Sequence, residues 1–75
     1  MKNQNSYILY VSEDCKWCAM AKALLDSYDA VYELRFERCS EWSTYPAIYR
    51  SRNNAPPELI GGFRELSTLS TKEDL

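Results

Sequence analysis

The sequence contains no histidine and only three cysteines, which removes most ways of building a metal centre. A structural zinc ion needs four ligands, and these are most often cysteine and histidine side chains. Three cysteines are also too few for the disulfide scaffold of a small secreted domain. We therefore expect no metal site within one chain, although a metal shared between two chains stays open.

Long apolar runs and an excess of positive charge are missing as well. The longest nearly apolar stretch is YILYV, whereas a membrane-spanning helix needs about 20 residues. The net charge of −2 leaves no basic surface to neutralise phosphates. The first residues, MKNQNS, lack the apolar core of a secretion signal. We expect no membrane and no nucleic acid as partners, and a cytoplasmic location.

The 75 residues suffice for one domain with a small core. Strand and helix patterns alternate along it. YILYV is apolar on both faces, which is typical of a strand in the middle of a sheet, and VYELRF alternates between apolar and charged residues. The pattern predicts a strand, a helix, a strand, a turn or two of helix, two strands and a helix, at residues 7–11, 15–28, 31–36, 37–43, 47–51, 58–60 and 63–69.

This order predicts an α/β fold, β-α-β-(short α)-β-β-α, with a four-stranded mixed sheet and flanking helices. The first two strands should be parallel because a helix connects them. The last two strands should form a hairpin. On the first helix, Met20, Leu24, Leu25 and Tyr28 form one apolar stripe with Ala21 beside it, and this stripe should face the sheet.

A closely spaced cysteine pair begins the first predicted helix. Cys15 and Cys18 stand at positions i and i+3 and share one helix face. Unpaired backbone N–H groups at a helix N-terminus stabilise a thiolate at Cys15, the reactive form of the side chain. Cys18 lies one turn further in and should be more buried. Dithiol chemistry needs this asymmetry, with one thiol to attack and one to resolve.

Charged residues flank the pair with opposite effects. Glu13 and Asp14 precede Cys15, and carboxylates disfavour a nearby thiolate, whereas Lys16 adds a cation. We expect Asp14 or Ser12 to cap the helix. Three interpretations of the pair are open: redox chemistry, a metal site and a structural disulfide. A Cys-x-x-Cys motif near a βαβ pattern favours redox chemistry, and a disulfide closing so short a loop adds little stability.

Three short motifs occur in the order typical of one family. CKWC covers residues 15–18, TYP covers 44–46 and GGFREL covers 61–66. With the order of the elements, they resemble a glutaredoxin of the thioredoxin fold, over residues 7–69. The resemblance implies that residues 1–75 form one glutaredoxin-like domain.

The resemblance also implies a role for each motif. Cys15 is the expected nucleophile and Cys18 the resolving thiol. The bond before Pro46 is expected to be cis, and backbone groups of Tyr45 are expected to pair with a peptide-like substrate. N–H groups at Gly62 and Phe63, where the last helix begins, are expected to receive a ligand carboxylate. The implied substrate- and glutathione-binding residues are Lys16, Trp17, Thr44, Tyr45, Pro46, Gly62, Phe63 and Arg64.

The chain departs from the family pattern around the glutathione site. The cation that usually precedes the first cysteine is replaced by the acidic residues 13–14, and Lys16 or Arg38 is the available substitute. Arg64 stands where the family often has an acceptor for the γ-glutamyl amine, a role for which Glu65 is a candidate.

The resemblance implies a glutathione-dependent thiol–disulfide oxidoreductase that reduces protein disulfides and glutathione mixed disulfides as a monomer. Its expected partners are glutathione and disulfide-containing proteins, ribonucleotide reductase among them, and it requires no metal. One alternative is a glutaredoxin-like redoxin that takes electrons from thioredoxin reductase and donates them to ribonucleotide reductase. A second alternative is an iron–sulfur or metal carrier.

Three further side chains invite an interpretation. Cys39 is expected to be a small buried side chain, with a regulatory thiol as the alternative. Trp42 is expected to be a packing residue. Trp17, between the two cysteines, either packs against Ala21 and Tyr28 or forms part of the rim that contacts substrate.

Overall fold

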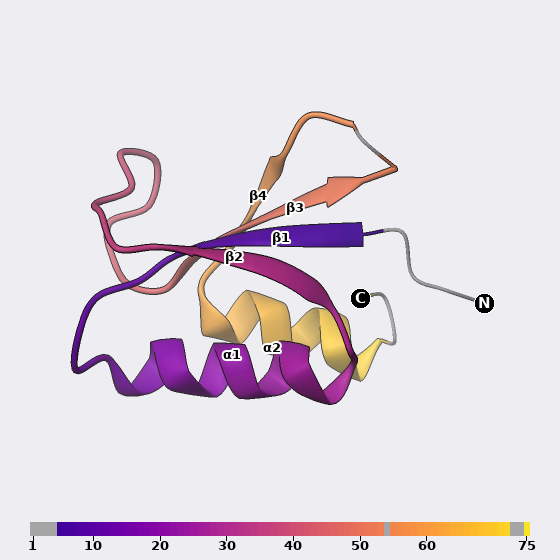
Figure 1. The fold of residues 1–75 in the computed structure, drawn as a ribbon, viewed down its shortest axis with the longest axis horizontal. Helices are drawn as coiled ribbons and strands as arrows, with labels where there is room; N and C mark the ends of the chain where they lie inside the picture. The colour runs from indigo at the N-terminus through magenta and orange to yellow at the C-terminus, as the bar shows by residue number, and fades with distance from the viewer. Residues whose placement is uncertain (1–4, 54, 73–74) are drawn as a thin grey trace.

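The computed structural model describes residues 5–53, 55–72 and 75. This part of the chain forms four strands and two helices (Figure 1). In chain order they are β1 (Asn5–Tyr10), α1 (Lys16–Ser27), β2 (Val31–Arg35), β3 (Ala47–Arg52), β4 (Glu58–Gly61) and α2 (Phe63–Thr71). The predicted α/β class is confirmed, and most element boundaries lie within two residues of those predicted.

The four strands form one mixed sheet in the order β2-β1-β3-β4. β1 pairs with β2 in parallel and with β3 antiparallel, and β3 pairs with β4 antiparallel. The central first strand, the parallel first pair and the final hairpin are therefore confirmed. The register places Tyr10 beside both Arg35 and Ala47, and Ile48 beside Gly61. Because of this register, the segments that follow β1 and β2, precede β3 and follow β4 all lie at one edge of the sheet.

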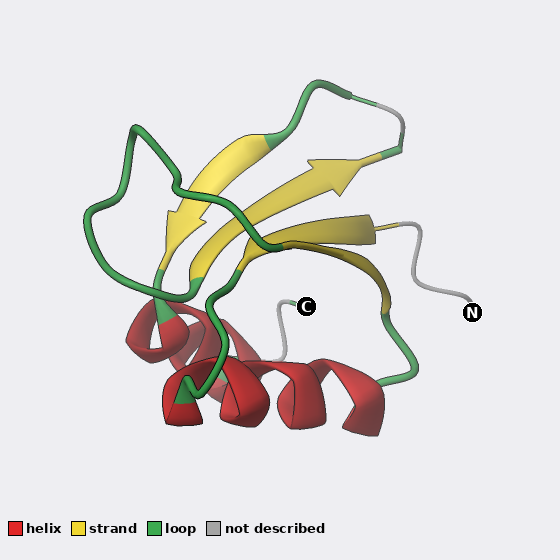
Figure 2. Ribbon diagram, turned by 60° about the vertical axis from the view of Figure 1, so that its left-hand side comes forward, coloured by secondary structure: helices red, strands yellow, loops and turns green. Residues whose placement is uncertain are grey.

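Both helices lie on the same face of the sheet and run side by side (Figures 1 and 2). Alternate residues of β1 point toward them, as the period of a strand requires. The buried core cluster consists of Tyr7, Leu9, Val11, Cys18, Ala21, Leu25, Ile48 and Leu66. Small and branched side chains from α1 and one leucine from α2 thus fill the space under the central strand. At the far ends of the helices, the Tyr28 hydroxyl lies 2.8 Å from the Ser70 hydroxyl.

The face of α1 that points to the sheet differs from the predicted stripe. The buried residues are Cys18, Ala21 and Leu25, whereas Met20 and Tyr28 are 39% and 43% exposed. The inward position of Cys18 explains the difference, because residues three and seven positions later then also face the core. The largest apolar side chains therefore predict a buried face of α1 that is rotated about the helix axis relative to the observed face.

The predicted turn or two of helix at residues 37–43 is wrong. Between β2 and β3, the described chain forms turns and bends instead of a helix. The segment carries Ser40, Ser43 and Thr44, whose hydroxyl groups compete for backbone hydrogen bonds, and it ends at Pro46.

Candidate active site at the Cys15–Cys18 disulfide

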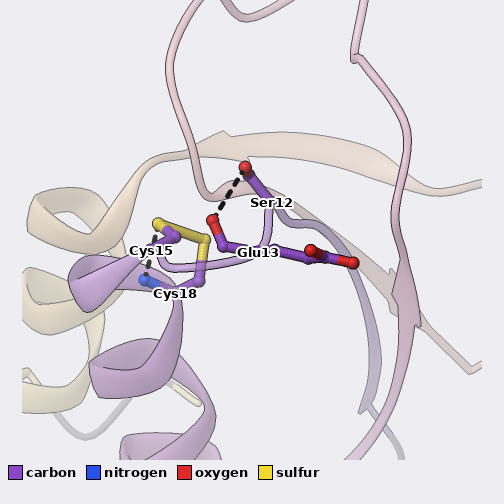
Figure 3. Close-up of a disulfide and its surroundings, with 4 residues drawn as sticks. All are labelled: Ser12, Glu13, Cys15 and Cys18. Atoms are coloured by element: carbon purple, nitrogen blue, oxygen red, sulfur yellow. Dashed lines mark hydrogen bonds between the residues drawn. A yellow bond between two sulfur atoms is a disulfide. The ribbon is translucent and has the colours of Figure 1, made fainter.

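Cys15 and Cys18 are joined by a disulfide at the beginning of α1 (Figure 3). Their Cα atoms lie 5.2 Å apart, within the usual range for such a bond. Cys15 is half-buried, whereas Cys18 is only 4% exposed and belongs to the core cluster. The predicted difference in burial is confirmed, so an external thiol or disulfide has easier access to Cys15.

The helix cap is Cys15 itself, and not Asp14 or Ser12 as predicted. Cys15 has an extended backbone, and its Sγ accepts a hydrogen bond of 3.1 Å from the N–H of Cys18. Asp14 turns the chain with a φ of 57°, a region that aspartate tolerates better than most residues. The Ser12 hydroxyl donates to the carbonyl of Glu13. The sulfur of Cys15 therefore occupies the position where the helix terminus favours negative charge.

The disulfide lines a hollow of about 560 Å³, which we call the disulfide hollow. Its wall is formed by Val11, Ser12, Glu13, Asp14, Cys15, Lys16, Cys18, Ala19, Lys22, Leu34 and Phe36. Sequence reasoning missed Lys22 and Phe36. The predicted strand at 31–36 includes Phe36, but β2 ends at Arg35 and Phe36 is 65% exposed. Two sequence signals point to these residues. Lys22 follows Cys18 by one helical turn, and Phe36 follows the strand that pairs with β1.

A second hollow, of about 330 Å³, lies beside the starts of the two helices. We call it the aromatic hollow, and its wall is formed by Trp17, Trp42, Thr44, Tyr45, Pro46, Gly62, Phe63, Arg64 and Glu65. Every predicted binding residue except Lys16 lies on this wall. Residues from three distant segments are brought together because these segments meet at one edge of the sheet.

The Tyr45–Pro46 peptide bond is cis, as predicted. Pro46 is fully buried, and Tyr45 beside it is exposed at the wall of the aromatic hollow. Trp42 was expected to be a packing residue and is half-buried. Among the described residues, its indole N–H has no hydrogen-bond partner. An ideal Cβ on Gly62 would lie 3.4 Å from that nitrogen, an ordinary contact distance, so the indole does not require a glycine at this position.

The start of α2 differs from the expectation that its N–H groups are open to a ligand. The N–H of Gly62 donates to Glu65 Oε1 at 2.9 Å. Only this half of a capping box can form, because a glycine has no side chain to return the bond. Gly62 is therefore already bonded within the chain, and Glu65 brings a carboxylate to the place predicted to receive one. Phe63 begins the helix, and its N–H has no acceptor within the helix itself.

The two cationic candidates, Lys16 and Arg38, do not line the aromatic hollow itself. The ammonium group of Lys16 is 5.6 Å from the centre of the Trp17 ring, and Lys16 lies on the wall of the disulfide hollow. Arg38 lines another hollow, together with Cys39 and Trp42. Arg64 is exposed and reaches the aromatic hollow from α2.

Trp17 connects the two helix starts. Its ring centre lies 5.6 Å from that of Phe63, with the planes tilted by 36°. Half of Trp17 is exposed, and the remainder lines the aromatic hollow. The side chain thus packs on α2 and also forms part of the rim beside the disulfide.

The third cysteine lies away from the pair, in the segment before β3. Cys39 is buried, as expected, and its sulfur lies 3.4 Å from the Tyr49 hydroxyl. Tyr49 also donates to the carboxylate of Glu41. The contacts with Cys39 and, second, with Glu41 raise the pKa of Tyr49 above its ordinary value. Among the described residues, no three potential metal ligands gather in one place.

Comparison of the sequence with protein-family models and with curated proteins finds no match to either. Neither helix in the described part of the chain has the length and apolar character needed to cross a bilayer. The geometry of the site consists of a partly exposed sulfur at a helix terminus, a buried sulfur bonded to it, and a hollow that both cysteines line. The aromatic hollow begins at Trp17, between the two cysteines in the sequence.

Proposed function

We propose that the protein is a glutathione-dependent thiol–disulfide oxidoreductase of the glutaredoxin type. The observation that carries the proposal is the asymmetry of the disulfide. Cys15 Sγ lies at the N-cap and accepts the N–H of Cys18, while Cys18 is buried beneath it. A thiolate forms most readily at the first position, and a resolving thiol is protected at the second.

In the proposed forward reaction, the Cys15 thiolate attacks one sulfur of a substrate disulfide. A new bond forms between that sulfur and Cys15 Sγ, and the second substrate sulfur leaves as a thiolate. The Cys18 thiolate then attacks Cys15 Sγ, which forms the internal disulfide and expels the first substrate sulfur as a thiolate. The substrate gains two electrons, and the cysteine pair loses two.

Glutathione returns the pair to its reduced form in two steps. The thiolate of one glutathione attacks Cys15 Sγ, and the electron pair of the broken bond stays on Cys18 Sγ. A second glutathione thiolate attacks the glutathione sulfur of the mixed disulfide, which releases oxidised glutathione and the Cys15 thiolate. For glutathione mixed disulfides, glutathione alone can complete the cycle without Cys18.

The arrangement of the elements supports the proposal. A four-stranded mixed sheet in the order β2-β1-β3-β4, with two helices on one face, is compatible with a thioredoxin-like fold. The cysteine pair follows the central strand, and a cis peptide bond precedes β3. Tyr45 and the first turn of α2 line one hollow, where an extended peptide can lie.

A second candidate is favoured by the start of α2. The N–H of Gly62 is bonded to Glu65, and two exposed carboxylates precede Cys15, so a glutathione carboxylate meets negative charge. A redoxin fed by thioredoxin reductase, with ribonucleotide reductase as its electron acceptor, needs no glutathione site. Its substrates and its reductant are proteins, which make contact over a larger surface.

The test is a paired turnover assay on the purified protein with a small disulfide substrate. One arm supplies NADPH, glutathione reductase and glutathione, and the other supplies NADPH and thioredoxin reductase. We expect turnover in the first arm. Turnover only in the second arm selects the redoxin. Silence in both arms, with a metal or cluster spectrum in the isolated protein, selects a carrier and rejects both oxidoreductases.

A further inference from the structure

The proposed cycle places negative charge on two sulfur atoms in different surroundings. Cys15 Sγ lies at the N-cap, where the helix terminus stabilises a thiolate. Cys18 lies one turn inside and is 4% exposed, and the effect of the terminus falls off within the first turn. A buried thiolate is disfavoured unless a cation lies close to it. Cys18 therefore needs compensation from another group.

The disulfide hollow contains four charged side chains. The loop after β1 provides Glu13 and Asp14, and α1 provides Lys16 and Lys22. β2 and the residue after it contribute only apolar side chains to this wall. Among the residues that the structure describes, none of these four side chains forms an ion pair. The two carboxylates disfavour a thiolate, so the position of the lysines decides the balance.

Of the two lysines, Lys22 is the better placed for Cys18. The ammonium group of Lys16 lies over the ring of Trp17, at 5.6 Å from its centre. Lys22 follows Cys18 by four residues on α1, a spacing that brings the two Cβ atoms to about 5–6 Å. It is half-buried and lies on the wall of the hollow that also contains Cys18.

We propose that Lys22 is a positioning residue whose ammonium group stabilises the thiolate of Cys18. The inference deepens the proposed function and rests on it. When an external thiolate attacks Cys15 Sγ, the S–S bond breaks and its electron pair moves to Cys18 Sγ, beside Lys22. In the resolving step the Cys18 thiolate attacks Cys15 Sγ and expels the bound thiolate. Both steps need the same buried negative charge.

The experiment follows the reaction of the reduced protein with dithionitrobenzoate by stopped-flow absorbance. Cys15 attacks the reagent and releases one coloured thiolate, and Cys18 then displaces a second one from Cys15. The two phases therefore report the two cysteines separately. Cys39 is replaced by Ala in every variant, so that only two thiols react. The variants are Lys22→Met, Lys22→Arg and the control Lys72→Met, which removes the same charge at the other end of α2 from the site.

We expect Lys22→Met to slow the second phase about threefold to tenfold near neutral pH, since the loss of one close charge moves an ionisation by up to about one pH unit. The pH at which this phase reaches half its maximum should rise. The first phase should be unchanged, and Lys22→Arg and Lys72→Met should resemble the parent protein. Circular dichroism checks that each variant is folded.

Two results overturn the assignment. A second phase in Lys22→Met equal to that of the parent at every pH removes the electrostatic role. A second phase equally slow in Lys22→Arg shows that packing, and not charge, is responsible. Failure of the proposed function looks different, because the parent protein then releases a single coloured thiolate and Cys18 resolves nothing.

Discussion

The two helices begin side by side, but different groups accept the free N–H groups of their first turns. At α1 the cap is the sulfur of Cys15, which accepts the N–H of Cys18. At α2 the cap is Gly62, which has no side chain, and the carboxylate of Glu65 turns back to accept its N–H. The first helix start thus has a partly exposed sulfur atom as its cap, whereas the N–H of Gly62 at the second is bonded to a side chain of its own helix.

The difference shows how one local rule can serve two purposes. Both starts leave unpaired N–H groups that favour negative charge. In the proposed reaction, that charge at α1 is the thiolate of Cys15, whereas at α2 it is the carboxylate of Glu65. A ligand carboxylate at α2 therefore competes with Glu65, while a substrate sulfur at Cys15 has no such competitor within the cap.

The largest expected effect comes from the reactive cap. Cys15→Ser should reduce turnover at least about 100-fold, which corresponds to about 2.7 kcal/mol of activation free energy. Serine is itself a good N-cap, so the free energy of unfolding should change little. The measurement is turnover with glutathione and glutathione reductase, alongside urea unfolding of the reduced proteins. A large loss of stability in Cys15→Ser would assign the sulfur a structural role instead.

Cys18→Ser separates the two cysteines further. It should keep reduction of glutathione mixed disulfides while impairing reduction of protein disulfides, because only the second reaction needs a resolving thiol. Both substrates are compared with the same protein preparation. Equal and complete loss of both activities in the two serine variants contradicts the proposed monothiol cycle.

The next largest effect is expected at Gly61, in the turn before α2. Gly61 has a φ of 131°, and a Cβ there would lie 2.8 Å from Cγ of Glu65. Gly61→Ala should lower the free energy of unfolding by about 1–3 kcal/mol, since a strained backbone and a displaced Glu65 both add to the cost. Urea unfolding provides the measurement.

Gly62→Ala is the matched control for this change. Gly62 has a φ of −101°, which any residue adopts, and an added Cβ makes only ordinary contacts, at 3.4 Å or more. We expect a loss well below that of Gly61→Ala. Equal losses in the two variants contradict the role given to Glu65 at the turn.

A smaller effect is expected when the hydrogen bond between Glu65 and the N–H of Gly62 is removed. Glu65→Ala leaves the N–H of Gly62 without its acceptor and should lower the free energy of unfolding by about 1 kcal/mol. The same change removes the competing carboxylate, so we expect the KM for glutathione to fall by about twofold to threefold, in line with the size of one surface charge interaction. Glu65→Gln keeps an acceptor oxygen and should affect KM more than stability. An unchanged KM in both variants shows that glutathione does not approach the start of α2.

The sequence predicted the helices and strands better than the residues that cap the two helices. Strand alternation, the helix between two strands and the spacing of Cys15 and Cys18 are local patterns, so the parallel first pair of strands, the final hairpin and the different burial of the two cysteines could be predicted from them. The identity of a cap is harder to predict, because a shift of one residue in the preceding turn moves the cap to a neighbouring residue. Asp14 adopts a positive φ, so the helix begins at Lys16 and the cap falls on Cys15.

The partners of individual side chains were harder to predict, because they depend on rotation and on distant segments. The buried face of α1 was misjudged since Cys18, although small, points inward while Met20 points out. Residues 37–43 were given a helical turn that their hydroxyl side chains oppose. The sequence offers Glu65 as an acceptor for a ligand amine, but its carboxylate accepts the N–H of Gly62, the cap of its own helix.

The smallest expected effect concerns the side chain that joins the two helix starts. Trp17 is the second residue of α1 and contacts Phe63, the first residue of α2, with ring centres 5.6 Å apart. Ring pairs contribute about 0.5–1.5 kcal/mol, and this one lies near the low end because half of Trp17 is exposed. Trp17→Ala should therefore lower the free energy of unfolding by about 0.5 kcal/mol, with Trp17→Phe close to the parent. If the rim role dominates, turnover of protein disulfides falls in Trp17→Ala while stability hardly changes. If packing dominates, stability falls and turnover follows only the folded fraction, so urea unfolding and turnover measured on the same three proteins distinguish the two roles.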